Sequence, residues 1–135
     1  MGKDEVVLID TSSWIEALRD TGRTDIRERV LMLMTDGRAA WCDMVAVELW
    51  NGAKGDYERK KLSELEKEIA CLPSTSEVWQ KARLLAQQCR IAGKTVPSAD
   101  LLITACALTH HAGIEHCDFH IDLILKIHTA SKRKQ

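Results

Sequence analysis

A short apolar run near the start of the chain limits the possible folds more than any other segment. Residues 5–10 read Glu-Val-Val-Leu-Ile-Asp, a β-branched run that ends in a charge and is typical of a fully buried parallel strand. The residues that follow place Ser13 and Glu16 in the S-x-x-E pattern of a helix capping box. The chain therefore begins with a strand, a tight turn and a helix, and Asp10 lies at the carboxyl end of the strand.

The same alternation of strand and helix continues along the chain. Asp-Gly, Pro-Ser and single glycines separate the segments. We expect further strands at 39–42 and 114–118 and a last edge strand at 123–128. We expect helices at 24–34, from a cap at Asp43 to about Gly52, and at 57–69, 76–91 and 99–111. Strand–helix alternation implies a parallel sheet covered on both faces, so the prediction is an α/β/α sandwich with a short central parallel sheet.

The length of 135 residues fits one domain, with a core at about 5–130 and a frayed basic tail at 131–135. The five cysteines form no CxxC pair and lie mostly in apolar segments, which is typical of reduced thiols. No apolar run reaches the roughly 20 residues that span a bilayer, and no secretory leader is recognisable. We expect a cytoplasmic protein that does not contact a membrane.

The net charge of −1 does not indicate a protein that binds nucleic acid through its overall charge. A nuclease that uses acidic residues to hold metal can nevertheless be neutral overall and carry a basic rim. For most of the basic residues taken singly, a solvated surface position is the simpler interpretation. The candidate rim residues are Arg19, Arg23, Arg27, Lys54, Lys60, Lys61 and Lys132 to Lys134.

Four carboxylates are candidates for a common site. Asp10 and Asp118 end predicted strands, Glu48 lies one turn inside a helix, and Asp100 lies in the first turn of the helix that Ser98 is expected to cap. Ligands of open parallel sheets bind outside the carboxyl ends of the strands, so all four can face one edge. Clustered carboxylates repel one another unless a cation compensates, and Mg²⁺ or Mn²⁺ suits an all-oxygen site. Such a site would hydrolyse phosphodiesters.

Each of these residues also has a purely structural interpretation. Asp100 can stabilise a helix dipole, which is worth about 0.3–1 kcal/mol. Asp10 can cap a turn, and Glu48 can be a plain surface residue. Spacing alone leaves these alternatives open.

Several segments resemble the PIN domains of VapC-type toxins. Residues 7–19, Val-Leu-Ile-Asp-Thr-Ser-Ser-Trp-Ile-Glu-Ala-Leu-Arg, resemble the opening of these domains. Val47-Glu48-Leu49 with Gly52 resembles their second motif, and the segment from Ser98 to Leu108 resembles the third. Asp118-Phe119 resembles the end of the last motif. The resemblance covers about residues 5–130.

This resemblance implies a PIN fold, a Mg²⁺ or Mn²⁺ cofactor and endoribonuclease activity. It also implies that Asp10, Glu48 and Asp100 are metal ligands and that the Ser12 hydroxyl assists a metal-bound water. A homodimer is implied as well, together with inhibition by a small antitoxin, one segment of which fills a groove near the site.

The last motif departs from the family pattern. Its first acidic position is commonly Asp or Asn, and this chain has His116 there. The fourth ligand is then Asp118, Asp122 or absent, and we include Asp118 among the predicted site residues. A histidine ligand at position 116 would favour Mn²⁺ over Mg²⁺.

Two alternatives remain. His116 is compatible with a PIN-like module that has lost catalysis and binds only RNA or a protein partner, although three retained acidic residues argue against it. A zinc site is the other alternative, but only the spacing of His116 and His120 fits zinc ligands. The candidate zinc ligands are Cys106, His110, His111, His116, Cys117 and His120.

Overall fold

The computed structural model describes residues 5–133, and its central feature is a four-stranded parallel sheet in the order β3-β2-β1-β4. The strands are β1 (Val7–Ile9), β2 (Ala39–Cys42), β3 (Ala70–Leu72) and β4 (Gly113–Glu115). In the central register, Leu8 pairs with Ala40 on one side and with Ile114 on the other. β1 is buried along its whole length, as expected for a central parallel strand.

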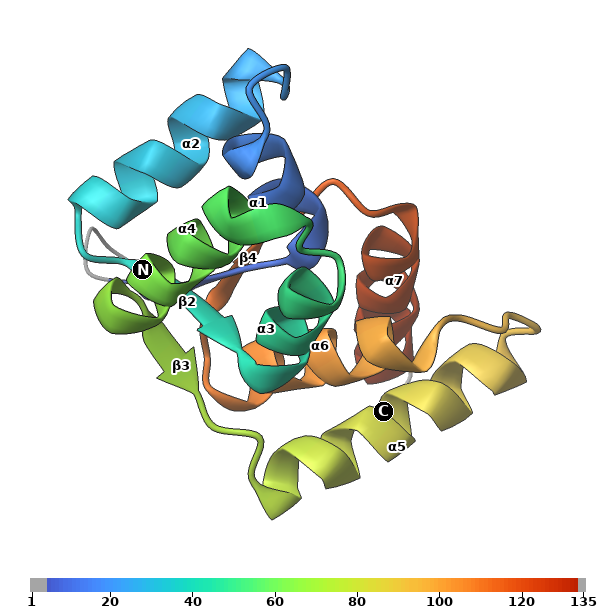
Figure 1. Ribbon diagram of the computed structural model, residues 1–135. Helices are drawn as coiled ribbons and strands as arrows, with labels where there is room; N and C mark the ends of the chain where they lie inside the picture. The colour runs from blue at the N-terminus through green and yellow to red at the C-terminus, as the bar shows by residue number, and fades with distance from the viewer. Residues whose placement is uncertain (1–4, 134–135) are drawn as a thin grey trace.

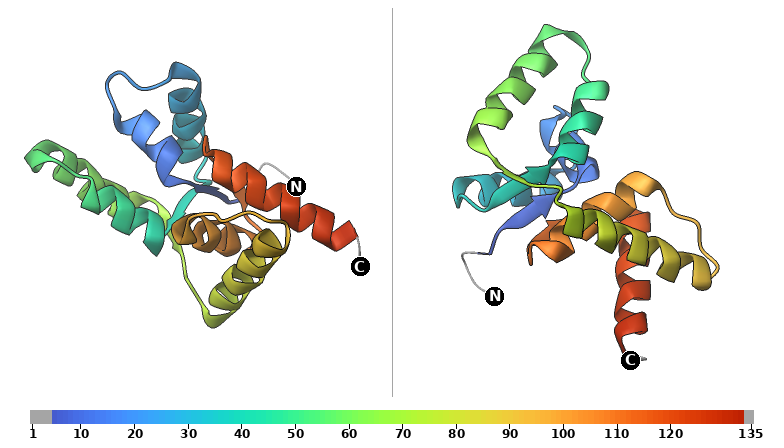
Figure 2. Two further views of the ribbon diagram at one scale, coloured as in Figure 1. Left: turned by 90° about the vertical axis from the view of Figure 1, so that its right-hand side faces the viewer. Right: turned by 90° about the horizontal axis from the view of Figure 1, so that it is seen from below.

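Seven helices in the described range 5–133 surround this sheet. They are α1 (Thr11–Leu18), α2 (Thr24–Thr35), α3 (Asp43–Asn51), α4 (Gly55–Glu68), α5 (Ser76–Ile91), α6 (Ser98–Thr109) and α7 (Phe119–Arg133). α5, α6 and α7 pack against one another on one side of the sheet, and α1 packs on α2 on the other (Figures 1 and 2). α3 and α4 form a hairpin that extends away from the sheet (Figure 2). The predicted α/β/α sandwich is confirmed.

The core lies between the sheet and these helices. Leu8 and Ile9 of β1 are completely buried, and Trp14 of α1 packs edge-on against Trp41 of β2 with 6.3 Å between ring centroids. α6 is buried along nearly its whole length, from Asp100 to Ala107. This burial fixes the first turn of α6, and with it Asp100, relative to the end of β1.

Two local predictions were wrong, and one strand was missed. Residues 123–128 form no edge strand but lie within α7, because Ile121, Ile124 and His128 are buried at helical spacing. α7 also continues through 131–133, so this part of the tail is not frayed; residues 134–135 lie outside the described residues. β3 was missed because it is short and partly exposed, and it lies at the edge of the sheet beside β2.

Helix starts also differ from the prediction. Asp10, not Ser13, caps α1, and Ser13 is buried inside the helix. α3 begins at Asp43 itself, after Cys42, and α6 begins at Ser98 after Pro97. None of the helices in the described part of the chain is long and apolar enough to span a membrane.

Candidate metal centre

Asp10 lies where β1 gives way to α1, at the carboxyl edge of the sheet. Its residue is 2% exposed, and its Oδ2 accepts hydrogen bonds from the Ser12 backbone N–H at 3.1 Å and from the Ser12 hydroxyl at 2.6 Å. The other oxygen, Oδ1, is buried without a hydrogen-bond partner among residues 5–133. A buried carboxylate oxygen without a partner is costly, so this oxygen is suited to a cation.

Ser12 joins two separate segments of the chain. Its hydroxyl donates to Asp10 and accepts the backbone N–H of Cys117 at 3.1 Å. The contact ties the start of α1 to the connection between β4 and α7, which contains Asp118. Because the single hydroxyl hydrogen is already donated to Asp10, this geometry favours a positioning role for Ser12 over direct contact with a water molecule.

Asp100 occupies the first turn of α6 and is 8% exposed. Burial raises the pKa of its carboxyl group to about 6, and the charges of Asp118, Asp10 and Glu48 act in the same direction, while His120 opposes them. The other three carboxylates expected from the sequence therefore each act electrostatically on Asp100. Within the described residues, no lysine or arginine forms an ion pair with any of the four.

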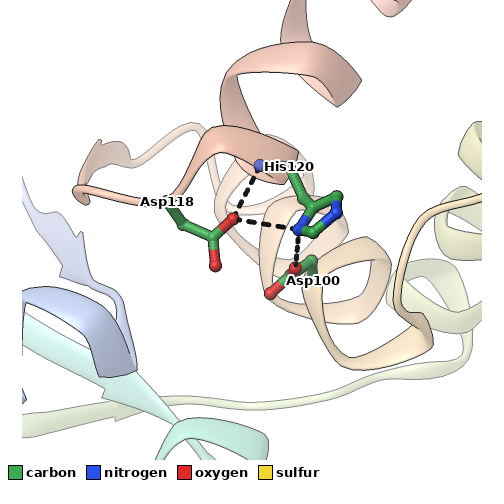
Figure 3. Close-up of side chains that lie close together, drawn as sticks. All are labelled: Asp100, Asp118 and His120. Carbon is green, nitrogen blue, oxygen red and sulfur yellow. Dashed lines mark hydrogen bonds and ion pairs between the residues drawn. The ribbon is translucent and has the colours of Figure 1, made fainter.

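Asp118 and His120 approach Asp100 from the start of α7 (Figure 3). Oδ1 of Asp118 accepts the backbone N–H of His120 at 2.7 Å, which satisfies a free donor at the helix start. Nδ1 of His120 lies 3.6 Å from Asp118 Oδ1 and 3.7 Å from Asp100 Oδ2. The three residues each offer a ligand atom, and these atoms lie within 4.8 Å of one another.

Glu48 reaches the site from α3. It is half-buried, and its Oε1 accepts a 2.7 Å hydrogen bond from the hydroxyl of Thr11 in the first turn of α1. α1 and α3 also pack against each other. The contact holds Glu48 beside the first turn of α1.

His116, which occupies the usual acidic position of the last motif, is bonded elsewhere. Its Nδ1 accepts the backbone N–H of Asp118 at 3.2 Å, so its Nε2 carries the proton and faces Asp122 Oδ1 at 3.3 Å. Asp122 is largely exposed on α7. The geometry thus brings Asp118 to Asp100 and leaves His116 and Asp122 paired with each other.

The donor set suits a hard or borderline divalent cation. Its members are carboxylates and one imidazole, without a thiolate. Of the six candidate zinc ligands, the structure brings only His120 into a group of three metal-ligating residues among the described residues. Cys106 faces the Leu72 carbonyl and His110 the Pro73 carbonyl, so the zinc alternative has no geometric support.

His120 is the site residue that the sequence did not single out. It appeared only among the zinc candidates, because histidine is not part of the resembled motif. The available signal was its place two residues after Asp118 at a helix start, which turns both side chains toward α6. The predicted strand at 123–128 is incompatible with a helix that begins at 119, so this signal was missed.

Four residues of the candidate basic rim make local side-chain contacts. Arg23 pairs with Asp25, Arg19 with Glu16, and Arg27 donates to the Asp20 carbonyl. Lys61 lies over the ring of Tyr57 on α4, 4.7 Å from its centroid. These contacts agree with ordinary solvated surface positions for the residues named.

The chain is similar to several known proteins. The model of the PIN domain family matches residues 7–124. Ribonuclease VapC11 of Mycobacterium tuberculosis is 34% identical over 125 residues, which cover 90% of this chain and 93% of the relative. The VapC ribonuclease Mb1587 of Mycobacterium bovis has the same identity and coverage.

Two solved structures resemble the fold. VapBC-1 of nontypeable Haemophilus influenzae has a TM-score of 0.73 at 18% identity, covering 90% of this chain and 92% of that chain. FitAcB of Neisseria gonorrhoeae has a TM-score of 0.70 at 20% identity, and the match covers 88% of this chain and 92% of that chain. At these identities, the likeness concerns the fold.

Proposed function

The chain belongs to the PIN domain family, and from this premise we propose that it is a metal-dependent endoribonuclease acting as the toxin of a toxin–antitoxin pair. The observation that carries the proposal is the buried oxygen of Asp10 without a partner, beside Asp100 with its raised pKa. Ribonuclease relatives that match along 90% of the chain support the choice of RNA as the substrate.

We assign the metal site to Asp10, Glu48, Asp100 and Asp118, with Mg²⁺ or Mn²⁺ as the cofactor. The ionised forms of these residues disfavour one another electrostatically, and a divalent cation would relieve that repulsion. Ser12 and Thr11 hold two of the carboxylates in place through the hydrogen bonds to Asp10 and Glu48.

When bound, the divalent ion would lower the pKa of a water molecule, polarise the phosphodiester and neutralise charge on the leaving oxygen. The protein residues orient this chemistry. Asp10 and Asp100 lie on buried, rigid elements, which keeps their oxygens in place. Asp118 is more exposed, with 25% of its side chain accessible, and would therefore border the side from which RNA enters. Loops and single strands are the RNA forms with accessible bases.

We assign the antitoxin to a groove of about 420 Å³ near the site. Its walls come from α1, α2 and the end of α4, and Trp14, one turn from Asp10, forms part of them. Leu31 on α2 is 64% exposed there, so its apolar side chain is accessible to a partner that occupies the groove. Apolar and charged side chains both line the groove, so an amphipathic antitoxin segment fits it. The lining residues are Trp14, Ala17, Leu18, Thr24, Arg27, Glu28, Leu31, Met34 and Leu65.

The solved relatives of this fold include VapBC and FitAB assemblies, which supports a protein partner for this chain. We further propose a homodimer that works in the cytoplasm. Sedimentation of the purified protein, with and without its antitoxin, measures whether the protein is a dimer.

The catalytically inactive module is the less favoured alternative. Its motive was His116 in an acidic position, but the geometry supplies the Asp118 carboxylate beside Asp100 without any contribution from position 116.

The proposal is tested with a single-stranded RNA of defined sequence and Asp10→Asn, with Asp36→Asn as the control at an exposed position. We expect Asp10→Asn to lose cleavage by at least about a thousandfold while Asp36→Asn keeps it, because only Asp10 lies at the site. Full cleavage by a folded Asp10→Asn protein would contradict the assignment.

A further inference from the structure

We propose that His120 is a metal ligand through Nδ1 and that it makes the site selective for a divalent transition metal such as Mn²⁺ over Mg²⁺. This inference rests on the proposed metal-dependent function and adds a nitrogen donor to the carboxylates of that site. It also reassigns the expected metal preference from His116, where the sequence placed it, to His120.

The position of the His120 ring suits a metal ligand. Nδ1 of His120 lies between two carboxylates from different elements, 3.6 Å from Asp118 Oδ1 and 3.7 Å from Asp100 Oδ2 (Figure 3). Two donors bound to one ion at about 2.1 Å each can be at most about 4.2 Å apart. Both distances lie within that limit, so one ion can be bound by Nδ1 together with either oxygen.

The His120 ring is not held in place by hydrogen bonds to the Asp100 and Asp118 carboxylates. Hydrogen bonds between N–H and oxygen are rarely longer than about 3.2 Å, and both distances exceed that value. The ring thus faces two acidic oxygens without donating a hydrogen bond to them. A cation between the three groups would account for this arrangement better than a direct contact.

The buried Asp10 carboxylate supports a metal at this site independently of His120. Asp10 is 2% exposed, and its Oδ1 has no hydrogen-bond partner among residues 5–133. Asp10 acts electrostatically on Asp100, yet no lysine or arginine of the described residues forms an ion pair with either aspartate. The cluster is therefore an incomplete polar site, not a closed network of protein hydrogen bonds.

His116 cannot take the same role without breaking two contacts. Its Nδ1 accepts the Asp118 backbone N–H and its Nε2 faces Asp122. By contrast, the side chain of His120 is 42% exposed. When Nδ1 of this ring binds the metal, its Nε2–H can therefore donate a hydrogen bond to water. The two histidines of the last motif thus have separate roles, one structural and one directed at the metal.

The chemical consequence concerns the choice of ion. Mg²⁺ prefers oxygen donors, whereas imidazole increases the affinity for transition metals along the series that begins at Mn²⁺. A site with one nitrogen and several carboxylate donors would bind Mn²⁺ more tightly than Mg²⁺. Replacing His120 would remove most of that difference.

Pulsed electron paramagnetic resonance of the full-length protein with bound Mn²⁺ tests the inference without an activity assay. We expect hyperfine coupling to a directly bound nitrogen, which changes when the protein contains isotope-labelled histidine. The coupling disappears in His120→Ala and remains in His116→Ala, the matched control. The dissociation constant for Mn²⁺ increases at least about tenfold in His120→Ala, and that for Mg²⁺ less than about threefold.

The outcomes separate this inference from the proposed function. Mn²⁺ bound to the wild type without nitrogen coupling, or coupling that persists in His120→Ala, overturns the role of His120 and leaves a carboxylate metal site intact. Failure of Mn²⁺ and Mg²⁺ to bind, with RNA cleavage that persists in EDTA, overturns both. If His120→Ala does not fold, His120→Gln serves in its place, because it keeps much of the side-chain volume and removes the ring nitrogen, so the nitrogen coupling should disappear in it as well.

Discussion

The hydroxyl of Ser12 donates a 2.6 Å hydrogen bond to Oδ2 of Asp10, two residues before it at the start of α1. The same hydroxyl accepts the N–H of Cys117, so it connects the aspartate at the end of β1 with the segment that contains Asp118. One small side chain thereby sets the relative position of two acidic groups that are distant in sequence. The expected consequences of this and of the other contacts can be measured.

Ser12→Ala should lower the rate of RNA cleavage about 10–100-fold, the usual effect of losing a contact that orients a metal ligand. Unfolding free energy should fall by only about 1–2 kcal/mol. Single-turnover cleavage and urea denaturation measure the two effects. Ser12→Thr should restore much of the rate, and Ser63→Ala on the exposed face of α4 is the control. Wild-type cleavage by Ser12→Ala would show that the bridge has no role.

Asp100 should make the stability of the metal-free protein depend on pH. Its pKa rises from 3.8 to about 6 in the folded protein, chiefly through burial, so the folded state binds the proton more tightly than the unfolded state. The resulting stabilisation is present below about pH 4 and is lost as the pH rises through about 6.

In EDTA, Asp100→Asn should therefore be more stable than the wild type at pH 7.5, by about 1–3 kcal/mol, and the difference should shrink toward pH 4. Urea denaturation across this pH range measures it. Asp36→Asn, at an exposed position, should leave the pH profile unchanged. A profile for Asp100→Asn that is parallel to the wild-type profile would contradict the raised pKa.

Metal binding should have the opposite pH dependence. Because protons compete with the ion for Asp100, Mn²⁺ should stabilise the protein less at pH 5 than at pH 7.5. Thermal denaturation with and without Mn²⁺ at each pH measures this difference. An equal increase in melting temperature at both pH values would argue that Asp100 does not bind the ion.

Leu31→Asp should weaken antitoxin binding at least about tenfold, or about 1.4 kcal/mol, without lowering RNA cleavage by the free protein. The reason is that Leu31 lies in the groove on α2 and not among the carboxylates. Ile91→Asp is the control, because Ile91 is 88% exposed at the end of α5, on an element that does not line the groove. Calorimetric titration measures the affinity. Unchanged affinity for Leu31→Asp would place the partner on another surface.

The helical assignment of α7 has its own test. Ile124 is completely buried, and Ile124→Ala should cost about 2–5 kcal/mol of unfolding free energy. Lys126→Ala, two residues along on the exposed side, should cost less than about 0.5 kcal/mol. Similar losses for both substitutions would contradict the buried face at helical spacing.

The central strands and the placement of Asp10 and Asp100 could be predicted because strong local patterns encode them. Asp118 was expected at the end of a strand at 114–118, but β4 ends at Glu115 and Asp118 precedes α7 instead. The apolar strand that ends in Asp10 and the helix that begins just before Asp100 both have clear sequence boundaries. Parallel strands then place their carboxyl ends at one edge, which brings distant residues together by topology.

The errors arose where local patterns were short or ambiguous. Residues 123–128 form a short, mostly apolar run that resembles a strand, but the burial of Ile121 and the cap at Asp118 belong to a helix that begins earlier. β3 has three residues and depends on pairing with β2, which no local pattern reports. Because His120 lies on the first turn of the misassigned helix, its approach to Asp100 could not be predicted either.

The central claim is that clustered carboxylates hold a metal ion that cleaves RNA. It is tested most directly by incubating the protein, freed of antitoxin, with total cellular RNA and Mn²⁺ or Mg²⁺, beside lanes with EDTA and with Asp100→Asn. We expect discrete fragments that are absent in both of these lanes and that return when metal is added in excess of EDTA. Fragments that persist in EDTA, or that Asp100→Asn still produces at the wild-type rate, would contradict it.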